Sequence, residues 1–426
     1  MRSVACHTLG CKVNQYDSQA MLELFEEAGY EIREFSDKAD VYVVNTCTVT
    51  GTGDKKSLQA VRRVLRQNPA AHVVIAGCLA QRDGEKLLST GARLVIGNAR
   101  RKEVVTLLEE AIDQNQQIAA VSDILRTSYE PLTISRHEGH TRAVLKIQEG
   151  CDRYCTYCII PYVRGGIRSR KPADIRAEAE RLALAGFAEL VLTGIHLTSY
   201  GRDLEGETLL DAIRACDVPG VQRIRLGSLE PVIVTEAFVS ALKEEKKVCP
   251  QFHLALQSGC DSVLKRMRRR YTTEEFENAC HLLRAAFPDC AITTDVIAGF
   301  PGETEDEFAQ TMAFCQKIGF ARMHVFPYSA RQGTPAAQMS NQVQKAVREE
   351  RARQLIAVGN HLAKNYMKNQ LGSIQEVLAE ECENGLAHGY TAPYISCQFP
   401  GGIPGKVYKI RMTGLTEDGL AGEIAE

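Results

Sequence analysis

Long apolar segments are missing from this 426-residue chain, and no stretch approaches the roughly 20 apolar residues that a membrane-spanning helix requires. The first residues, Met1–His7, contain no apolar run of signal-peptide length. The sequence also has no fixed-period repeat and no low-complexity tract. These absences argue against a membrane protein or an exported one. We therefore expect a globular, cytoplasmic protein of roughly three domains.

The chain carries little net charge, a formal −2 at pH 7, which argues against a protein that coats nucleic acid through bulk electrostatics. Local basic clusters can still contact phosphates, although each alone is more typical of a solvated surface. The candidates are Arg266–Arg270, Arg168–Lys171, Arg62 with Arg63 and Arg66, and Arg100–Lys102.

Cysteine is plentiful, with 15 residues, which fits a reducing compartment where thiols persist or bind metal. Nine of them lie in ordinary helix, strand or loop patterns, and we interpret these as core residues. They are Cys6, Cys216, Cys249, Cys260, Cys280, Cys290, Cys315, Cys382 and Cys397.

Three cysteines, Cys151, Cys155 and Cys158, share one short loop in the sequence G-C-D-R-Y-C-T-Y-C-I-I-P. Thiolates are the ligands that iron–sulfur clusters take, and the loop is too short for two separate sites. An odd number of thiols argues against disulfides, and zinc would need a fourth nearby ligand. The spacing C-x3-C-x2-C therefore favours a [4Fe-4S] cluster with one open iron over buried structural cysteines.

Three further cysteines follow predicted strands in the first hundred residues, where apolar runs at 4–9, 41–44, 72–76 and 94–96 alternate with amphipathic stretches at 18–28 and 54–66. Cys11, Cys47 and Cys78 each come directly after one of these runs. Ligands of parallel sheets gather at the carboxyl ends of strands, so these cysteines can meet and hold a second cluster. Gly10 and Gly77 would let the backbone approach that site closely.

A second strand–helix alternation begins at Ala143, with strand-like runs at 143–148, 189–192, 223–226, 252–256, 292–297 and 323–326. Six units in about 190 residues predict an open (β/α)6 barrel, because a complete (β/α)8 barrel takes about 250 residues. The Cys151 loop follows its first strand, at the face where such barrels carry their chemistry. Candidate cofactor contacts near the ends of the other strands are Thr193, Gly194, Glu230, Gln257 and Val296, joined by Tyr157 of the cysteine loop.

The remaining segments complete a three-part α/β organisation. Residues 122–141 are polar and turn-prone, which predicts a linker between the two α/β domains. The pattern of residues 342–369 predicts one helix with an apolar side. From residue 371, short β-like runs at 374–378, 390–397 and 407–413 alternate with glycine turns, which predicts a small β-barrel. We expect domains at 1–121, 142–366 and 367–426.

The motifs T-L-G-C-K-V-N, V-V-N-T-C-T-V-T, E-G-C-D-R-Y-C-T-Y-C-I-I-P and D-V-I-A-G-F-P-G-E-T resemble those of the radical S-adenosylmethionine methylthiotransferases along nearly the whole chain. The resemblance implies a cluster-binding N-terminal domain, a radical S-adenosylmethionine (SAM) barrel and a TRAM-type β-barrel. It further implies that the Cys151 set holds the [4Fe-4S] cluster that cleaves SAM, and that the Cys11 set holds an auxiliary [4Fe-4S] cluster that supplies or carries sulfur. The implied partners are a tRNA anticodon stem-loop, an electron donor such as flavodoxin or ferredoxin, and a sulfur source.

Three substrates compete within that family: threonylcarbamoyladenosine at tRNA position 37, isopentenyladenosine at the same place, and an aspartate of a ribosomal protein. The motif H-T-L-G-C-K-V-N-Q-Y-D, together with residues 51–56, 228–231 and 253–259, looks most like the enzymes that act on threonylcarbamoyladenosine. We therefore expect methylthiolation at C2 of that base, which lies in a single-stranded loop where it can be splayed out. An arginine would suit the threonyl carboxylate.

The C-terminal region departs from the expected pattern, since residues 368–426 hold four Lys/Arg (Lys368, Lys406, Lys409, Arg411) against eight Asp/Glu. This module can touch RNA with one face, such as Lys406, Tyr408, Lys409 and Arg411, or it can merely cap the barrel. Two rival functions remain for the chain: a radical enzyme of another reaction class with an electron-relay cluster, and a non-enzymatic iron–sulfur RNA-binding or redox-sensing protein.

Overall fold

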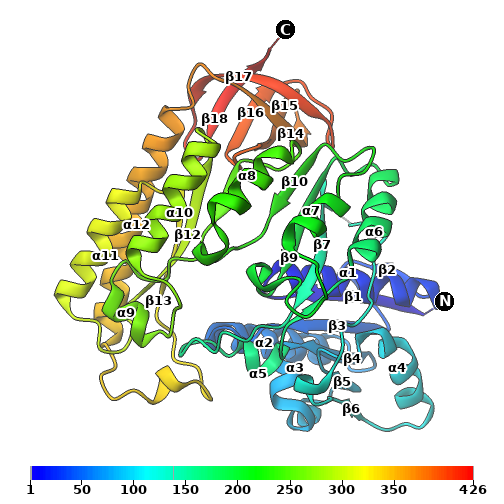
Figure 1. Cartoon of the computed structure of the whole chain (residues 1–426). Coiled ribbons are helices and arrows are strands. Elements are labelled where there is room, and N and C mark those ends of the chain that lie inside the picture. The colour runs from blue at the N-terminus through cyan, green and yellow to red at the C-terminus, as the bar shows by residue number, and fades with distance from the viewer. Residues whose placement is uncertain (1, 138, 426) are drawn as a thin grey trace.

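The computed structural model describes residues 2–137 and 139–425. Its regions follow the chain (Figure 1): an N-terminal α/β unit in blue and cyan, a central barrel in green and yellow, and a C-terminal β-barrel in red. Within the described residues, no helix combines the length and apolar character needed to cross a membrane. All fifteen cysteines are free.

The N-terminal unit is a parallel sheet in the order β2-β1-β3-β4-β5-β6. Its strands are β1 (Ser3–Thr8), β2 (Glu31–Arg33), β3 (Val41–Thr46), β4 (His72–Gly77), β5 (Leu94–Ile96) and β6 (Ile118–Ala120), and its helices are α1 (Lys12–Glu27), α2 (Gly51–Gln67), α3 (Cys78–Asp83) and α4 (Val104–Asp113). The four predicted strands are confirmed. The sequence did not reveal β2 and β6, since each has three residues, lies at a sheet edge and is only partly buried.

The central region confirms the expected open barrel. Parallel strands β7 (Arg142–Glu149), β9 (Glu189–Gly194), β10 (Arg223–Leu226), β11 (Gln251–His253), β12 (Ala291–Ala298) and β13 (Arg322–Pro327) follow one another around it. Isolated bridges such as Leu229 with Leu254 join β10 to the β11 side, and the two-residue β8 (Arg168–Ser169) pairs antiparallel to β7.

Helices cover the outside of this barrel and lead out of it. They are α5 (Ile160–Arg164), α6 (Pro172–Leu184), α7 (Leu209–Ala215), α8 (Glu236–Glu244), α9 (Asp261–Arg266), α10 (Thr273–Ala286), α11 (Glu305–Ile318) and α12 (Lys345–Lys368). Thr272 and Thr304 form capping boxes with Glu275 and Glu307, which fixes the first turns of α10 and α11. Short 3-10 turns lie at Gly84–Thr90, Arg101–Glu103, Ile124–Arg126, Leu197–Ser199, Pro231–Ile233 and Pro335–Gln338.

Helix α1 joins the first unit to the barrel by packing on β7. The Tyr16 side chain is buried in the same apolar core as the barrel strands, and its hydroxyl donates to the Leu132 carbonyl at 2.8 Å and contacts Glu178 at 2.9 Å. Leu132 and Ile134, from the segment expected to be a linker, are buried in that core as well. The segment therefore packs between the two units.

The C-terminal region is a closed barrel of β14 (Ile374–Glu383), β15 (Leu386–Thr391), β16 (Ser396–Pro400), β18 (Leu420–Ile424) and β17 (Val407–Leu415), in that order. The expected small β-barrel is thus confirmed, but the run predicted at 390–397 is wrong: a turn separates β15 from β16. The run contains Pro393, which cannot donate a strand hydrogen bond, and Tyr394 has φ +70°.

This barrel caps the end of the central one. Arg223 donates to the Thr391 carbonyl at 2.9 Å, and Arg225 donates to the Ala392 carbonyl at 2.9 Å. Tyr390 and Tyr394 stack with ring centroids 4.7 Å apart, beneath the Arg142 guanidinium. The C-terminal barrel thus packs on the central one, and RNA contact through one of its faces stays a prediction. On β17, Tyr408 packs against Phe399 while Lys409 and Arg411 are exposed, so Tyr408 does not share their face.

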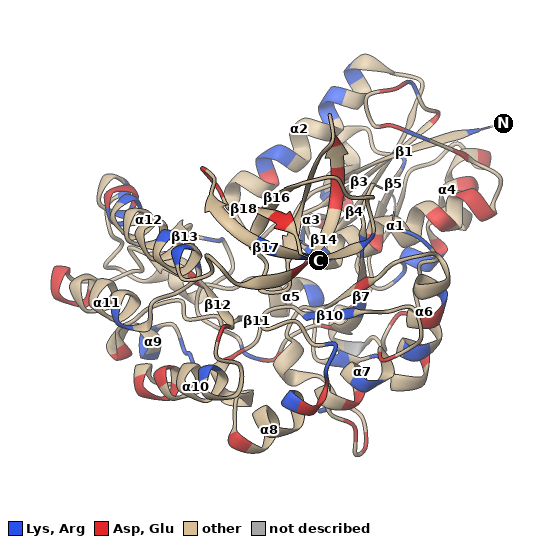
Figure 2. Cartoon of the chain, turned by 90° about the horizontal axis from the view of Figure 1, so that it is seen from above, with Lys and Arg blue, Asp and Glu red and all other residues tan. Residues whose placement is uncertain are grey.

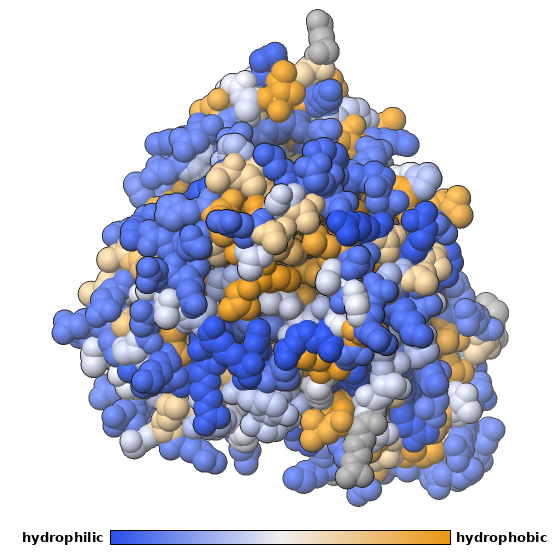
Figure 3. Space-filling model, viewed as in Figure 1, coloured by the Kyte–Doolittle hydropathy of each residue, from blue (hydrophilic) through white to orange (hydrophobic). Residues whose placement is uncertain are grey.

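Figure 3 shows apolar residues lying among strongly hydrophilic ones across the middle of the molecule. Of the nine cysteines interpreted as core residues, seven are buried, Cys6 is half-buried and Cys382 is exposed. The interpretation is therefore wrong for Cys382, which lies at the end of β14 near the turn into β15.

Candidate functional site

The loop from Cys151 to Cys158 leaves the carboxyl end of β7 and is held on both sides by backbone hydrogen bonds. The Cys151 amide donates to the Gly165 carbonyl at 2.9 Å, and the Thr156 amide donates to the Met267 carbonyl at 3.1 Å. Inside the loop, the Cys158 amide donates to the Cys155 carbonyl at 2.9 Å. The three cysteines predicted from spacing are thus fixed in one turn at the C-terminal face of the barrel.

Hydrogen-bond donors reach two of these sulfur atoms. The Arg153 amide donates to Cys151 Sγ at 3.4 Å, and Arg269 Nη1 donates to Cys155 Sγ at 3.4 Å. Burial raises the pKa of the Cys151 thiol to about 11 and that of Cys158 to about 12. The loop thus provides covered thiols, which an iron cluster would hold in the thiolate form.

The candidate contacts from the other strands come to this same face. Thr193 and Gly194 end β9, Glu230 follows β10, and Gln257 follows β11 and forms a bridge with Val296 of β12. Gln257 has φ +67°, an uncommon backbone conformation for a residue with a side chain. Val296 is fully buried in the apolar core, so its side chain is a packing residue. Tyr157 packs against a separate apolar cluster that includes Met267 and Tyr328.

Glu230 is the charged centre of this face. Its carboxylate lies 2.8 Å from Arg153 Nη2, 2.9 Å from Arg269 Nη2 and 3.2 Å from His196 Nε2. Desolvation opposes ionisation, but these three partners outweigh it and lower the pKa of Glu230 to about 2. Because the Arg269 guanidinium also donates to Cys155 Sγ and Arg153 belongs to the cysteine loop, the Glu230 carboxylate holds this guanidinium beside the loop. The sequence predicted Glu230 but gave no indication of its partners.

The second set of cysteines meets at the carboxyl edge of the N-terminal sheet, as predicted. Cys11 precedes α1, Cys47 follows β3, and Cys78 starts α3 directly after β4. Gly10 has φ +106°, and a Cβ there would lie 2.9 Å from Cys47 Cβ and 3.0 Å from its sulfur. Gly77, at φ +90°, leaves no room for a side chain beside Asn45 and Thr46. Gly10 thus allows the close approach of the Cys11 and Cys47 segments, and Gly77 allows that of the Cys78 and Cys47 segments.

Cys78 is the buried member of this set, and its partner comes from the barrel. Arg164 Nε donates to Cys78 Sγ at 3.2 Å, and Asn98 Nδ2 lies 3.8 Å from the same atom. Arg164 is fully buried at the last position of α5, the helix that starts directly after the Cys158 loop. Cys78 also packs against Ile159 and Val163 of that segment. Because this segment directly follows Cys158, the two cysteine sets are neighbours.

Arg164 belongs to a buried ionic network that ties the two units together. Its Nη1 lies 3.1 Å from Asp17 of α1 and 3.0 Å from Glu149 of β7. Arg101 and Lys146 also pair with Asp17, and each of these side chains is at most 3% exposed. Buried charges require such partners. Nothing in the local sequence pattern indicated Arg164, Asp17 or Arg101, because their pairing spans both units.

A second connection holds the Cys47 loop. Arg331, from the loop after β13, lies 2.7 Å from both Thr48 Oγ1 and Asp54 Oδ2. Arg82 contacts the same two groups at 2.6 and 2.9 Å. The Asp54 carboxylate is thus shared by one arginine from each unit, and α2 begins with Thr50 accepting from the Gly53 amide. The barrel therefore contacts both the Cys78 and the Cys47 side of the second site.

The basic clusters proposed for phosphate contact divide into two groups. Arg101, Arg168 and Arg170 are buried in the structure, so those parts of the prediction are wrong. Exposed arginines remain on α2, whose basic residues are drawn in blue in Figure 2, and at Arg268 and Arg270. The distinction is invisible in the sequence because buried and exposed arginines form similar short clusters.

The described residues contain no group of three His, Cys, Asp or Glu side chains close enough together to bind a single metal ion. The cysteines of a cubane site bind different iron atoms and lie farther apart than the ligands of one ion, so the two [4Fe-4S] sites stay a prediction.

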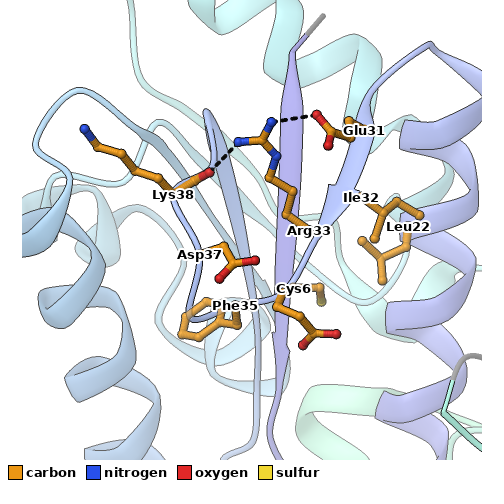
Figure 4. A pocket seen from close by; sticks show the side chains of 9 residues that line it. Cys6, Leu22, Glu31, Ile32, Arg33, Phe35, Asp37 and Lys38 are labelled. Carbon is orange, nitrogen blue, oxygen red and sulfur yellow. Dashed lines mark hydrogen bonds and ion pairs between the residues drawn. The ribbon is translucent and has the colours of Figure 1, made fainter.

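A separate hollow of about 800 Å³ lies at the β2 edge of the sheet (Figure 4). Its lining includes Arg33, which pairs with Glu31 and donates to the Lys38 carbonyl, together with Phe35 and the half-buried Cys6. None of the predicted cluster ligands lines it. We do not assign it to the functional site.

Comparisons with known proteins agree with the two-site geometry. Residues 3–97 match the uncharacterized protein family UPF0004, and residues 145–315 match the radical SAM superfamily. Among solved structures, the chain resembles the radical SAM methyltransferase TsrM from Kitasatospora setae with cobalamin and a [4Fe-4S] cluster bound. The TM-score is 0.59 with 15% identity over 79% of this chain and 77% of that one. Fold and cysteine loop together define a radical SAM enzyme.

Two curated relatives cover nearly the whole chain. Threonylcarbamoyladenosine tRNA methylthiotransferase MtaB of Bacillus subtilis is 43% identical over 97% of this chain and 94% of that protein. The enzyme of the same name from Thermotoga maritima is 36% identical over 99% and 96%, respectively. The chain belongs to the threonylcarbamoyladenosine tRNA methylthiotransferase family.

Proposed function

We propose that this protein is a tRNA methylthiotransferase that replaces the C2 hydrogen of N6-threonylcarbamoyladenosine, at position 37 beside the anticodon, with a methylthio group. The observation that carries the proposal is the adjacency of two cysteine triplets, each at the carboxyl edge of a parallel sheet. The relatives of the same enzyme name, 36–43% identical over nearly full length, support this substrate.

In this proposal Cys151, Cys155 and Cys158 hold a [4Fe-4S] cluster that binds SAM, and Cys11, Cys47 and Cys78 hold an auxiliary [4Fe-4S] cluster. When bound, these groups supply the electron that cleaves SAM and the soft sulfur chemistry that a C–H to C–S conversion requires. The residues of the chain orient them. Glu230 ties Arg153 of the Cys151–Cys158 loop to Arg269, and Arg164 donates to Cys78 of the second set.

The other candidate contacts have a supporting role at the same face. Thr193 and Gly194 form the end of β9, where a Cβ on Gly194 would collide with the Gln148 side chain. The backbone amide of Gln257 donates to the backbone carbonyl of Asp295 at 2.8 Å, which holds this residue in place. These groups would line the SAM site through short side chains and backbone. We further propose a cytoplasmic setting, with an electron donor such as flavodoxin or ferredoxin and a separate sulfur source.

The proposal is tested by mass spectrometry of nucleosides from tRNA of a strain lacking this protein, beside the complemented strain. Threonylcarbamoyladenosine should accumulate while its 2-methylthio form disappears, and complementation should restore the pair. A shift in the isopentenyladenosine pair instead would overturn the substrate. No change in either pair would direct attention to a ribosomal protein or to another radical reaction.

A further inference from the structure

A groove of about 400 Å³ lies beside the Cys151–Cys158 loop, between that loop and the turn that connects α9 to α10. Its lining residues are Asp152, Arg153, Tyr154, Arg268, Arg269 and Arg270. Two of them reach the thiol site directly: Tyr154 precedes Cys155, and Arg269 donates to Cys155 Sγ. Anything bound in the groove therefore lies next to the radical site.

The arginines of this groove differ in how their charge is balanced. Arg153 and Arg269 pair with Glu230, whereas Arg268 and Arg270 are exposed and, among the described residues, form no ion pair or side-chain hydrogen bond. Arg202 neutralises Asp152 at 3.0 Å. The groove thus presents two uncompensated guanidinium groups, which are suited to phosphate oxygens.

Exposed aromatic rings stand beside these charges. Tyr154 is 39% exposed and Tyr162 is 47% exposed, and their rings meet edge to face with centroids 5.6 Å apart. Tyr154 has φ +47° and Arg268 has φ +57°, left-handed conformations that bulky side chains seldom adopt. Residues held in such conformations concentrate at functional sites, where the surrounding structure fixes them. Each wall of the groove contains one residue with this left-handed backbone conformation.

We propose that this groove binds the single-stranded loop of the tRNA, with Arg268 and Arg270 contacting backbone phosphates and the Tyr154–Tyr162 pair stacking an unpaired base. The inference rests on the proposed function and assigns particular residues to substrate binding. Unpaired cations beside exposed aromatic rings are the combination that single-stranded RNA requires. An acidic electron-carrier protein would also use the arginines, but the exposed tyrosine pair favours RNA.

The test measures binding of the reconstituted full-length protein to tRNA carrying threonylcarbamoyladenosine, over a range of salt concentrations. In the Arg268→Gln/Arg270→Gln variant we expect Kd to rise roughly tenfold or more. The slope of log K against log salt should fall by about 1.4, since each phosphate contact to a single strand contributes about 0.7. The matched control, Arg176→Gln/Arg214→Gln, removes two exposed arginines from α6 and α7 and should leave Kd and slope unchanged.

Tyrosine variants separate stacking from charge. Tyr154→Ala should weaken binding roughly tenfold with an unchanged salt slope, because it removes the ring on which a base stacks, and Tyr154→Phe should bind like the parent. Iron content of each variant verifies that the neighbouring cysteine loop is still loaded. Equal binding by the parent and both variant sets would overturn the proposal.

Two further outcomes distinguish this inference from the function on which it rests. Suppose that the arginine variant binds tRNA normally, and that its reaction is slow with a protein electron donor but normal with dithionite. The groove is then a reductant-docking site and the RNA assignment is wrong. If the parent protein binds tRNA through this groove but transfers no methylthio group, the binding proposal stands and the proposed reaction fails.

Discussion

The two cysteine sites of this protein are built in opposite ways. Cys151, Cys155 and Cys158 lie within eight consecutive residues of one loop. Cys11, Cys47 and Cys78 come from three strand ends and meet only because β1, β3 and β4 are neighbours in one sheet. The first site depends mainly on its own loop, while the second depends on the packing of the N-terminal unit against the barrel. Substitutions far from the second site in sequence should therefore disturb it selectively.

The largest effect is expected from Cys155→Ala, which removes the central ligand of the local site. SAM cleavage and methylthiolation should both fall below detection, while about half of the iron remains in the three-strand site. Reductive cleavage assays and iron analysis on reconstituted protein measure this. Persisting cleavage would break the assignment of the loop as the radical site.

Replacing Arg164 with Met should damage the three-strand site of Cys11, Cys47 and Cys78 more than the Cys151–Cys158 loop. Asp17 and Glu149 would lose a buried partner, and removing one member of a buried ionic set costs about 3–5 kcal/mol of unfolding free energy. Denaturant unfolding of the metal-free protein gives this value, with Arg164→Lys as the milder control. Reconstituted Arg164→Met protein should lose iron first from the Cys11 set, as followed by spectroscopy in a Cys155→Ala background. Retention of that iron would contradict the role of Arg164.

Glu230→Gln sharpens the comparison at the local site through its pH dependence. The pKa of Glu230 is about 2 in the folded protein and about 4.3 when unfolded, so its ionised form stabilises the fold above pH ~4.3. That contribution, on the order of 2–3 kcal/mol, is lost as the pH falls toward 2. Parent and variant should therefore differ most in stability at pH 6, differ less at pH 3, and converge only as the pH approaches 2. A constant difference across this range would refute the ionic role.

The smallest effect is expected for Arg331→Gln, because Arg82 still pairs with Asp54 in its absence. A loss of roughly 1 kcal/mol is reasonable for one partly covered ion pair. Hydrogen exchange should speed up in residues 47–54 more than in residues 151–158. Equal protection in both loops would show that this arginine does not hold the Cys47 side.

The difference between the two sites also explains how far the sequence could be interpreted. Cysteine spacing predicted the local loop directly, and strand periodicity placed Cys11, Cys47 and Cys78 at one sheet edge. Neither pattern could reveal Arg164 or Asp17, whose pairing depends on how α1 meets β7. The same limit applies to Arg168 and Arg170, which resemble a basic surface cluster but are buried.

The wrong strand prediction at the C-terminal barrel has a tertiary cause beside the local effect of Pro393. The run 390–397 is rich in aromatic and β-branched residues, which favour strands, but its Tyr390 and Tyr394 rings turn toward Arg142 across the interface with the central barrel. Tertiary contacts thus override the strand propensity there. Edge strands β2 and β6 were not predicted from the sequence, because three residues are too few to show a strand periodicity.

The division of labour between the two sites is tested most directly by reconstituted Cys47→Ala protein, assayed in one reaction for SAM cleavage and for methylthiolated tRNA. The account predicts that cleavage to 5′-deoxyadenosine remains largely intact while no methylthio product forms. Loss of both activities, with iron still present in the Cys151 loop, would contradict the separation of roles between the local and the three-strand site.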